Sequence, residues 1–439
     1  MFQTMRNAWQ IRELRSKLLY TLLILLIFRI GSAIPVPFVD ASAVTPEMTG
    51  PMALVSMISG GGFSSATLFA LSITPYINSS IIIQLLTVAI PPLERLAKDG
   101  ENGRKKLAQI TRYVTVALGL LLGTAYYFML RNQYNAVPLY NNPIDILYAV
   151  TIILCFTAGS ALIMWLGEQI NEKGIGNGIS LLLFAGIISN VPSGVVFLYD
   201  ALVGQGFLAE GGANVGNIIG VFVVLVLFLA MIAFIVFSTN AERRIPVQYA
   251  KRVVGRKMYG GQNTFIPIKV NMSGVMPIIL AVSMLSLPSI IAMFAGKTEE
   301  WSGFLSVFSS SHWFYSLLYF VLIIAFAFFY VTIQYNPVEM ANNLRRNSGA
   351  IPGYRPGKPT SDYINRVLRK VTFIGALFLG VIAVFPSLFT MTMSALGNNY
   401  FSMITIGGTS IMIVVSVALE TVQQIESQMM MRHYKGFLE

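Results

Sequence analysis

The chain has 439 residues, of which 55% are hydrophobic and 11% are charged, and its mean hydropathy is +0.67. A soluble domain carries about a quarter of charged residues, so this composition excludes a soluble globular protein and indicates an integral membrane protein. The net charge of +11 is typical of a multi-span protein with basic cytoplasmic loops, and sequence-specific nucleic-acid binding is not expected.

Apolar stretches close to the ~20 residues that a bilayer-spanning helix needs predict ten membrane spans. In chain order they lie near residues 18–38, 73–92, 113–131, 146–166, 179–199, 216–238, 272–295, 313–335, 371–390 and 402–423. The fifth and tenth are the least regular, because Ser189-Asn190 and Gly407-Gly408-Thr409 fall inside them.

The basic residues predict the orientation of these spans. With a cytoplasmic N-terminus, the outer loops contain only Arg131 and Lys297, and Arg29 falls within the first span. The other 27 of the 30 Lys and Arg residues then lie on the cytoplasmic side. Because loops rich in Lys and Arg stay in the cytoplasm, both termini are expected there, as an even number of spans requires.

Ten spans divide into two halves of five, and we expect an N-terminal half of residues 1–200 and a C-terminal half of residues 201–439. An odd number of spans in each half means that the second half enters the membrane inverted. Inverted halves tend to place the functional site at their interface near the middle of the bilayer.

A short segment before the second span, SGGGFSSATLFALSI at residues 59–73, is apolar enough to enter a membrane and too short to cross it. It predicts a re-entrant half-helix near residues 60–71. Three consecutive glycines, Gly60, Gly61 and Gly62, would permit a hinge, and its Ser and Thr residues reduce its apolar character. The segment alone does not distinguish a mobile element from a permanently packed one.

The second span is unusually polar for a membrane helix. It contains Thr74, Asn78, Ser79, Ser80, Gln84 and Thr87, and Asn271 and Ser273 open the seventh span. Such side chains either form hydrogen bonds between helices, as is common in bundles, or face water or a partner that can move away.

Two long basic loops, near residues 239–270 and 336–370, separate spans on the cytoplasmic side. Their Pro, Gly and Tyr residues suggest ordered, protruding structure. They are either solvated loops that only enforce the topology or docking surfaces for a soluble partner.

No phosphate-binding loop, nucleophile motif or metal-ligand cluster is evident in the sequence, so no enzymatic activity, cofactor or metal is expected. Arg29 and Glu420 are the exceptional charges within the spans. Two functions fit inverted halves with a broken segment: a passive polypeptide channel and a secondary transporter for a small solute. The scarcity of charge inside the membrane favours the channel, because ion-coupled transporters use such charges.

Several blocks of the sequence resemble the SecY/Sec61-alpha family of protein-conducting channels, in order along the whole chain. They are FRIGSAIPVP at 28–37, FALSITPYINSSIIIQLL at 69–86, MWLGEQINEKGIGNGIS at 164–180, ERRIPVQYAKR at 242–252, KVNMSGVMP at 269–277, PGYRPGKPT at 352–360 and GGTSIMIVV at 407–415. WLGEQI followed by GIGNGIS is the most specific of them.

The resemblance implies an all-α channel of ten transmembrane helices in two inverted, pseudo-symmetric halves, with a short re-entrant plug helix. Such a channel would pass unfolded preproteins across a bacterial plasma membrane and release apolar segments sideways into the lipid. The implied partners are the SecE and SecG subunits, the ATPase SecA, the ribosome, the signal sequences of preproteins and the membrane lipids.

The resemblance also implies four groups of site residues. An aliphatic pore ring would comprise Ile73, Ile77, Ile179, Leu183, Ile279 and Ile413. The plug would include Gly60, Gly61, Gly62, Phe63, Ser64, Ser65, Thr67 and Leu68. A lateral gate between the second and seventh spans would use Asn78, Ser80, Gln84, Asn271 and Ser283, and SecA or the ribosome would dock on Arg355, Arg256, Lys257 and Lys251.

Overall fold

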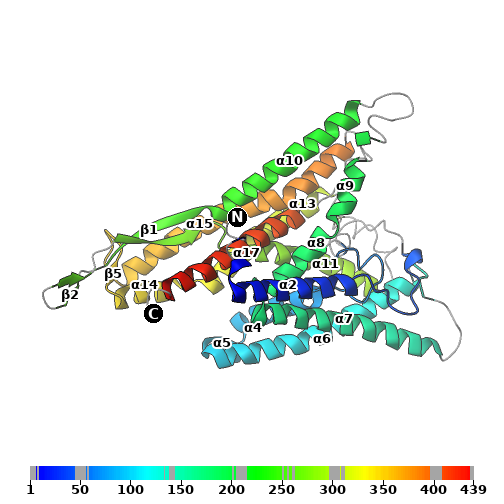
Figure 1. Ribbon diagram of the computed structural model, residues 1–439, viewed down its shortest axis with the longest axis horizontal. Coiled ribbons are helices and arrows are strands. Elements are labelled where there is room, and N and C mark those ends of the chain that lie inside the picture. The colour runs from blue at the N-terminus through cyan, green and yellow to red at the C-terminus, as the bar shows by residue number, and fades with distance from the viewer. Residues whose placement is uncertain are drawn as a thin grey trace.

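A computed structural model shows a bundle of long helices with a small β-structure at one end (Figure 1). It describes residues 6, 9–44, 56, 59–132, 134–137, 144–199, 202–203, 215–249, 252–254, 257–259, 263–295, 307, 312–395 and 408–435. The N-terminal half contains α2 (Arg12–Gly31), η1 (Ala41–Ala43), α4 (Thr74–Ala89), α5 (Pro91–Lys98), α6 (Gly100–Asn132), α7 (Ile144–Lys173), α8 (Gly178–Ile188) and α9 (Val191–Tyr199). The C-terminal half contains α10 (Val215–Asn240), α11 (Met276–Ala295), α13 (Trp313–Gln334), α14 (Pro337–Arg346), α15 (Lys358–Ala395) and α17 (Gly408–Lys435).

Each of the ten predicted spans overlaps a described helix. By length and composition, six described helices can cross a membrane, or up to seven if the bent pair Thr74–Ala89 and Pro91–Ala97 forms one span. The axes of that pair differ by 108°, because Pro91 and Pro92 begin a new helix just after α4 ends. The fifth span is divided into α8 and α9 at Ser189-Asn190, where the sequence predicted an irregularity.

The first long basic loop adds short β-strands to an otherwise helical chain. β1 (Glu242–Tyr249) pairs antiparallel with β4 (Asn263–Lys269) on one side and with β5 (Gly349–Ala350) on the other. A second pair joins β2 (Arg252–Val254) to β3 (Lys257–Tyr259). The reason is local: Ile245 and Val247 alternate with exposed residues along β1, the period of a half-buried strand.

The second long basic loop, near residues 336–370, contains regular structure. Helix α14 and strand β5 occupy its first part, and α15 begins at Lys358 and enters the bundle without a break. The apolar residues that continue through residues 364–371 explain this, since Ile364, Leu368 and Val371 pack against Ile245 of the sheet. The two loops therefore form one ordered unit with a shared core.

The helices pack around several apolar cores. One joins α2, the end of the 59–73 segment, α7 and α8 to part of α17, and another joins α10, α11, α13, α15 and α17. In Figure 1 the helices from α2 to α8 form one side of the bundle, α10, α13 and α15 form the other, and α17 lies between them. The start of α2 also meets the end of α17, through Leu14 and Ile425, so these two chain segments lie at the same end.

Candidate pore and plug site

The six predicted pore-ring residues come together in one apolar cluster. The three buried residues are Ile73, Leu183 and Ile413. The three partly buried residues are Ile77, Ile179 and Ile279. They come from α4, α8, α11 and α17, so both halves of the chain contribute. In α4, α8 and α11 these residues lie in or beside the first turns of the helix. The chain thus brings six aliphatic side chains together where four helices meet.

The motif between α7 and α8 positions the two ring residues of α8. The side chain of Asn171 accepts a hydrogen bond from the amide of Gly178, at 2.8 Å, and Asn177 caps α8 by accepting from the amide of Ile179. A Cβ on Gly178 would overlap the carbonyl oxygen of Gly167, so only glycine allows the two helices to approach this closely. This turn sets the direction in which Ile179 and Leu183 leave the helix.

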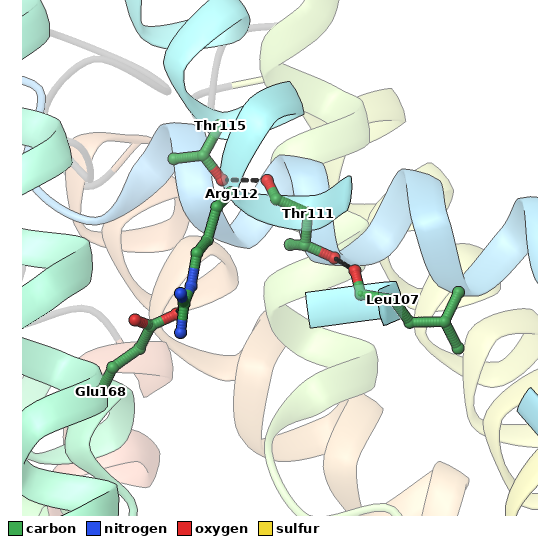
Figure 2. Close-up of polar contacts among 5 residues, drawn as sticks. All are labelled: Leu107, Thr111, Arg112, Thr115 and Glu168. Atoms are coloured by element: carbon green, nitrogen blue, oxygen red, sulfur yellow. Dashed lines mark hydrogen bonds and ion pairs between the residues drawn. The ribbon is translucent and has the colours of Figure 1, made fainter. Parts of the chain in front are cut away.

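The same motif holds α7 against α6 through an ion pair. Nε of Arg112 lies 2.8 Å from Oε1 of Glu168, and the two side chains point toward one another across the helices (Figure 2). Arg112 is about half exposed, so water screens the pair, and such pairs contribute about 0.2–1 kcal/mol. The ion pair joins α7 to α6 and so helps to position α7, and with it the α7–α8 turn, relative to α6.

Ile73 links the ring to the segment that precedes it. Its side chain is 1% exposed and it occupies the N-cap position of α4, with Thr74 and Pro75 starting the helix. Proline is favoured in the first turn, because its missing N–H would have no partner there. The backbone just before it is left-handed at Ser72, with φ of 49°, which ends the preceding turns. Ile73 is thus the point at which the irregular segment becomes a helix.

The plug segment, residues 59–73, consists of turns, so the predicted half-helix at residues 60–71 is wrong. The physical reason is that Ser and Thr side chains bond to the segment's own backbone and replace helical bonds. Ser59 accepts from the amide of Phe63, Ser64 donates to the carbonyl of Gly61, and Thr67 donates to that of Gly62. Gly60 and Gly61 adopt positive φ angles of 66° and 83°, a backbone conformation that favours glycine.

Outside groups hold the plug segment in place. An isolated antiparallel bridge pairs Thr67 with Pro35, in the chain that follows α2. The hydroxyl of Tyr126, buried on α6, donates to the carbonyl oxygen of Phe63. The ring of Phe63 also lies 4.5 Å from that of Tyr126, centroid to centroid. The segment therefore enters the bundle, turns, and leaves through α4 without crossing.

Two glycines that sequence reasoning missed shape the seat of the plug segment. A Cβ on Gly159 of α7 would overlap the carbonyl oxygen of Leu68, and one on Gly31 of α2 would overlap the ring of Phe69. A glycine inside an apolar helix is a signal for close approach of another chain segment, and FTAGSAL contains one. Tyr126 gave no comparable signal, because an aromatic residue in a span is common.

The predicted gate residues lie on α4 and on or before α11. Asn78, Ser80, Gln84 and Ser283 are partly buried, whereas Asn271 is 8% exposed and its Oδ1 has no hydrogen-bond partner. Nε2 of Gln84 lies 3.5 Å from Oγ of Ser80, within α4. Across the part of the chain that the structure describes, no hydrogen bond joins the α4 set to the α11 set. Helix α11 packs mainly against α13 and α6.

The predicted docking residues are described only in part. Arg355 is exposed, in a turn between Gly353 and Gly357, whose φ angles of 84° and 107° suit glycine. The backbone carbonyl of Arg355 accepts from Oγ1 of Thr360 at 2.8 Å. Lys257 lies in β3, but its side chain is outside the described part of the structure. Lys251 and Arg256 lie wholly outside the described residues.

Comparison with known proteins identifies the family. The SecY family model matches residues 67–422. The chain is 45% identical to protein translocase subunit SecY of Streptomyces scabiei and 40% identical to that of Bacillus subtilis, over 100% of each chain. The chain belongs to the SecY family of protein-translocating channels.

Solved structures of low sequence identity share its fold. A protein-conducting channel matches with a TM-score of 0.66 at 18% identity, covering 94% of this chain and 92% of the other. A SecY structure concerned with a plug domain that stabilises the closed state and maintains a membrane seal has a TM-score of 0.63, at 18% identity and the same coverage. Canine Sec61 in a ribosome–channel complex matches with a TM-score of 0.63 at 17% identity, again covering 94% of this chain and 92% of the other. The fold is that of the SecY/Sec61 channels, in a multi-pass membrane protein of bacterial type.

Proposed function

We propose that this chain is the pore-forming subunit through which unfolded preproteins cross the bacterial plasma membrane, and that the pore ring and the plug segment close it at rest. The observation that carries the proposal is the gathering of six aliphatic residues from α4, α8, α11 and α17 into one cluster. The plug segment runs directly into this cluster through Ile73.

An aliphatic ring suits a channel that must pass polypeptides and block ions. A constriction lined only by apolar side chains loses its water and presents a high barrier to ions. An arriving polypeptide can push these side chains apart, because no polar group in the ring binds it. The halves of residues 1–200 and 201–439 both supply ring residues, so movement between them would widen the constriction.

Sideways release of apolar segments requires two helices that can separate. We assign this lateral gate to α4 and α11, with Asn78, Ser80, Gln84, Asn271 and Ser283 at or near it. Hydrogen bonds between membrane helices contribute about 0.6 kcal/mol each. In the described part of the chain none joins the gate residues of α4 to those of α11, so such a gate would open at modest cost. The unpaired Oδ1 of Asn271 supports the assignment, since a buried acceptor gains from a partner that an opening gate admits.

The energy for transport would come from outside the chain, which we infer is not an enzyme. The ordered unit of β1, β4, β5 and α14 lies next to the exposed Arg355, and Lys257 lies in β3. Arg256 and Lys251, which lie outside the described residues, are near Lys257 in the sequence. We propose that SecA or a ribosome docks there, and that SecE and SecG complete the complex. Both termini would then be cytoplasmic, as the basic loops predict.

Reconstitution tests this function directly. The chain, purified with its small helical subunit, is placed in proteoliposomes with SecA, ATP and a preprotein, and the preprotein that becomes protected from protease is measured. We expect protection only when the motor, ATP and a signal sequence are all present. A solute transporter would instead accumulate a small molecule without any of them, and a failure to protect the preprotein would contradict the proposal.

A further inference from the structure

Arg29 is the cationic side chain that the sequence placed within a membrane span without a role. The structure puts it in the last turn of α2, where it is exposed. Its Nη1 lies 3.2 Å from the carbonyl oxygen of Gly60 and donates a hydrogen bond to it. Gly60 lies near the start of the described plug segment, 31 residues further along the chain.

Gly60 is fitted to this contact. A Cβ at this position would lie 2.7 Å from Oγ of Ser189, 3.2 Å from Nη1 of Arg29 and 3.3 Å from the carbonyl oxygen of Gly186. The φ angle of Gly60 is 66°, which a residue with a side chain rarely adopts. The glycine therefore turns its carbonyl toward Arg29 within a narrow gap between α2 and the end of α8.

The end of α8 also suits a cation. Gly186 and Ser189 belong to its last turn and C-cap, where backbone carbonyls carry partial negative charge. The guanidinium contacts the plug segment beside the end of α8, because a Cβ on Gly60 would touch both Nη1 of Arg29 and the carbonyl oxygen of Gly186. That carbonyl already accepts a hydrogen bond from Oγ of Ser189. If Arg29 only stabilised the C-terminus of α2, its guanidinium would not need to contact Gly60.

The hydroxyls of the plug segment mostly serve the segment itself. Ser59, Ser64 and Thr67 donate to carbonyls of residues 56, 61 and 62. Arg29 and Tyr126 are side chains of other elements that donate to its backbone, in addition to the bridge at Thr67. Displacement of the segment would require these contacts to be exchanged and its buried apolar side chains to leave their cores.

The two contacts differ in how easily they break. Tyr126 is buried and packed against Phe63 and Phe156, so its hydroxyl has no water to replace the carbonyl. Arg29 is exposed, so its guanidinium can separate from Gly60 without disturbing a packed core. A contact that is charged in the closed state and solvated in the open state suits a latch that must release.

We propose that Arg29 is a positioning residue that holds the plug segment in its closed place by binding the carbonyl of Gly60. The proposal rests on the proposed function, in which the plug segment seals the resting channel. The planar fork of arginine matters, because it can reach a carbonyl and still present donors to the end of α8. A lysine keeps the charge and loses this geometry.

The experiment follows the burial of one plug residue in the assembled complex in proteoliposomes. Cys155 is replaced by alanine and Ser59, which is 0% exposed, is replaced by cysteine. The rate at which a membrane-impermeant maleimide labels position 59 from the outer side is measured at rest, and again with a preprotein arrested in the channel. Arg29→Gln and Arg29→Lys are compared with Arg131→Gln, because Arg131 is another outer basic residue, bonded to Tyr127 and not to the plug segment.

We expect Arg29→Gln to raise the resting labelling rate by roughly threefold to tenfold, the range that loss of a charge-assisted hydrogen bond at an exposed site allows. Resting ion conductance and the export of preproteins with weak signal sequences should rise with it. Arg29→Lys should give an intermediate rate, and Arg131→Gln the rate of the parent.

Two failures can be told apart. If the arrested preprotein does not raise labelling of position 59 in the parent, the plug segment does not move and the proposed seal is wrong. If it does, and Arg29→Gln still labels at the parent rate at rest, the plug is the seal and Arg29 does not hold it. A fall in assembly with the small subunit for Arg29→Gln alone would indicate a folding role and would also overturn the proposal.

Discussion

Ile73 belongs to two parts of the molecule at once: it is the last residue of the plug segment and the N-cap of α4. Its side chain is among the largest that are fully buried, and it lies in the same cluster as Leu183 and Ile413 from other helices. A residue in this position couples the placement of the plug segment to the closure of the ring. Displacing the segment would pull on the ring residue that is most deeply buried.

The ring itself can be tested by adding polarity. Ile77→Asn with Ile279→Asn should admit water to the constriction and raise resting ion conductance in planar bilayers by about tenfold or more, because burying one Ile contributes ~1.5–3 kcal/mol. Preproteins with weak signal sequences should also pass more easily. The double Ile→Leu variant at these positions keeps the apolar volume and is the matched control. Equal conductance in the Asn and Leu variants would place the seal elsewhere.

At the scale of elements, α4 and α11 have different environments. Helix α4 is bent by 108° from α5 and packs against α6, whereas α11 packs against α13 and α6. The polar residues of α4 are largely satisfied within the helix, as Ser79 donates to Pro75 and Thr87 to Gln84. A helix whose polar groups need no partner can move away from its neighbours at little cost.

A disulfide across the proposed gate tests this movement. In a Cys155→Ala background, Ser80→Cys with Ser283→Cys should crosslink on oxidation and stop export of secreted preproteins in proportion to the crosslinked fraction. Reduction should restore export. The pair Ser80→Cys with Met284→Cys is the control, because Met284 is 50% exposed and points in another direction around α11. Normal export through the fully crosslinked first pair would exclude this gate.

At the scale of the whole molecule, the two long basic loops fold as one unit. Strand β5 of the second loop extends the sheet of the first, and Ile245 and Val247 share a core with Leu344 and Ile364. Helix α15 begins within this unit and continues into the bundle. A force applied to the loops would therefore be transmitted along α15 to the other helices. Arg355 lies at its exposed turn, between two glycines with positive φ.

Charge reversal at this turn separates docking from channel structure. Arg355→Glu should lower SecA-driven translocation by about tenfold or more, since a charge-assisted hydrogen bond contributes ~1.5–3 kcal/mol and a repulsion replaces it. Arg355→Lys should be partly tolerated, because it keeps the charge and loses the bidentate fork. The measurement is translocation per ATP at equal channel density, with Arg366→Glu as an exposed control on α15. If the two Glu variants behave alike, the charge at residue 355 has no specific docking role.

The sequence by itself determined the features that local composition encodes. Runs of apolar residues predicted the ten spans, each of which overlaps a described helix, and the quoted blocks indicated the family that the comparisons identify. The irregularity at Ser189-Asn190 and the hinge glycines Gly60 and Gly61 were readable for the same reason, because each depends on a residue and its neighbours. The strand pattern around Ile245 was also present in the sequence and was missed by treating the segment as a loop.

Only the tertiary structure decided what depends on contacts between distant residues. Residues 60–71 form turns through their own Ser and Thr side chains, and the bridge to Pro35, the hydroxyl of Tyr126 and the space at Gly159 decide where in the bundle those turns lie. The contact between Arg29 and Gly60 joins two segments whose separate sequences give no sign of each other. The physical reason is that periodicity reports which face of an element is buried, whereas long-range packing decides what buries it.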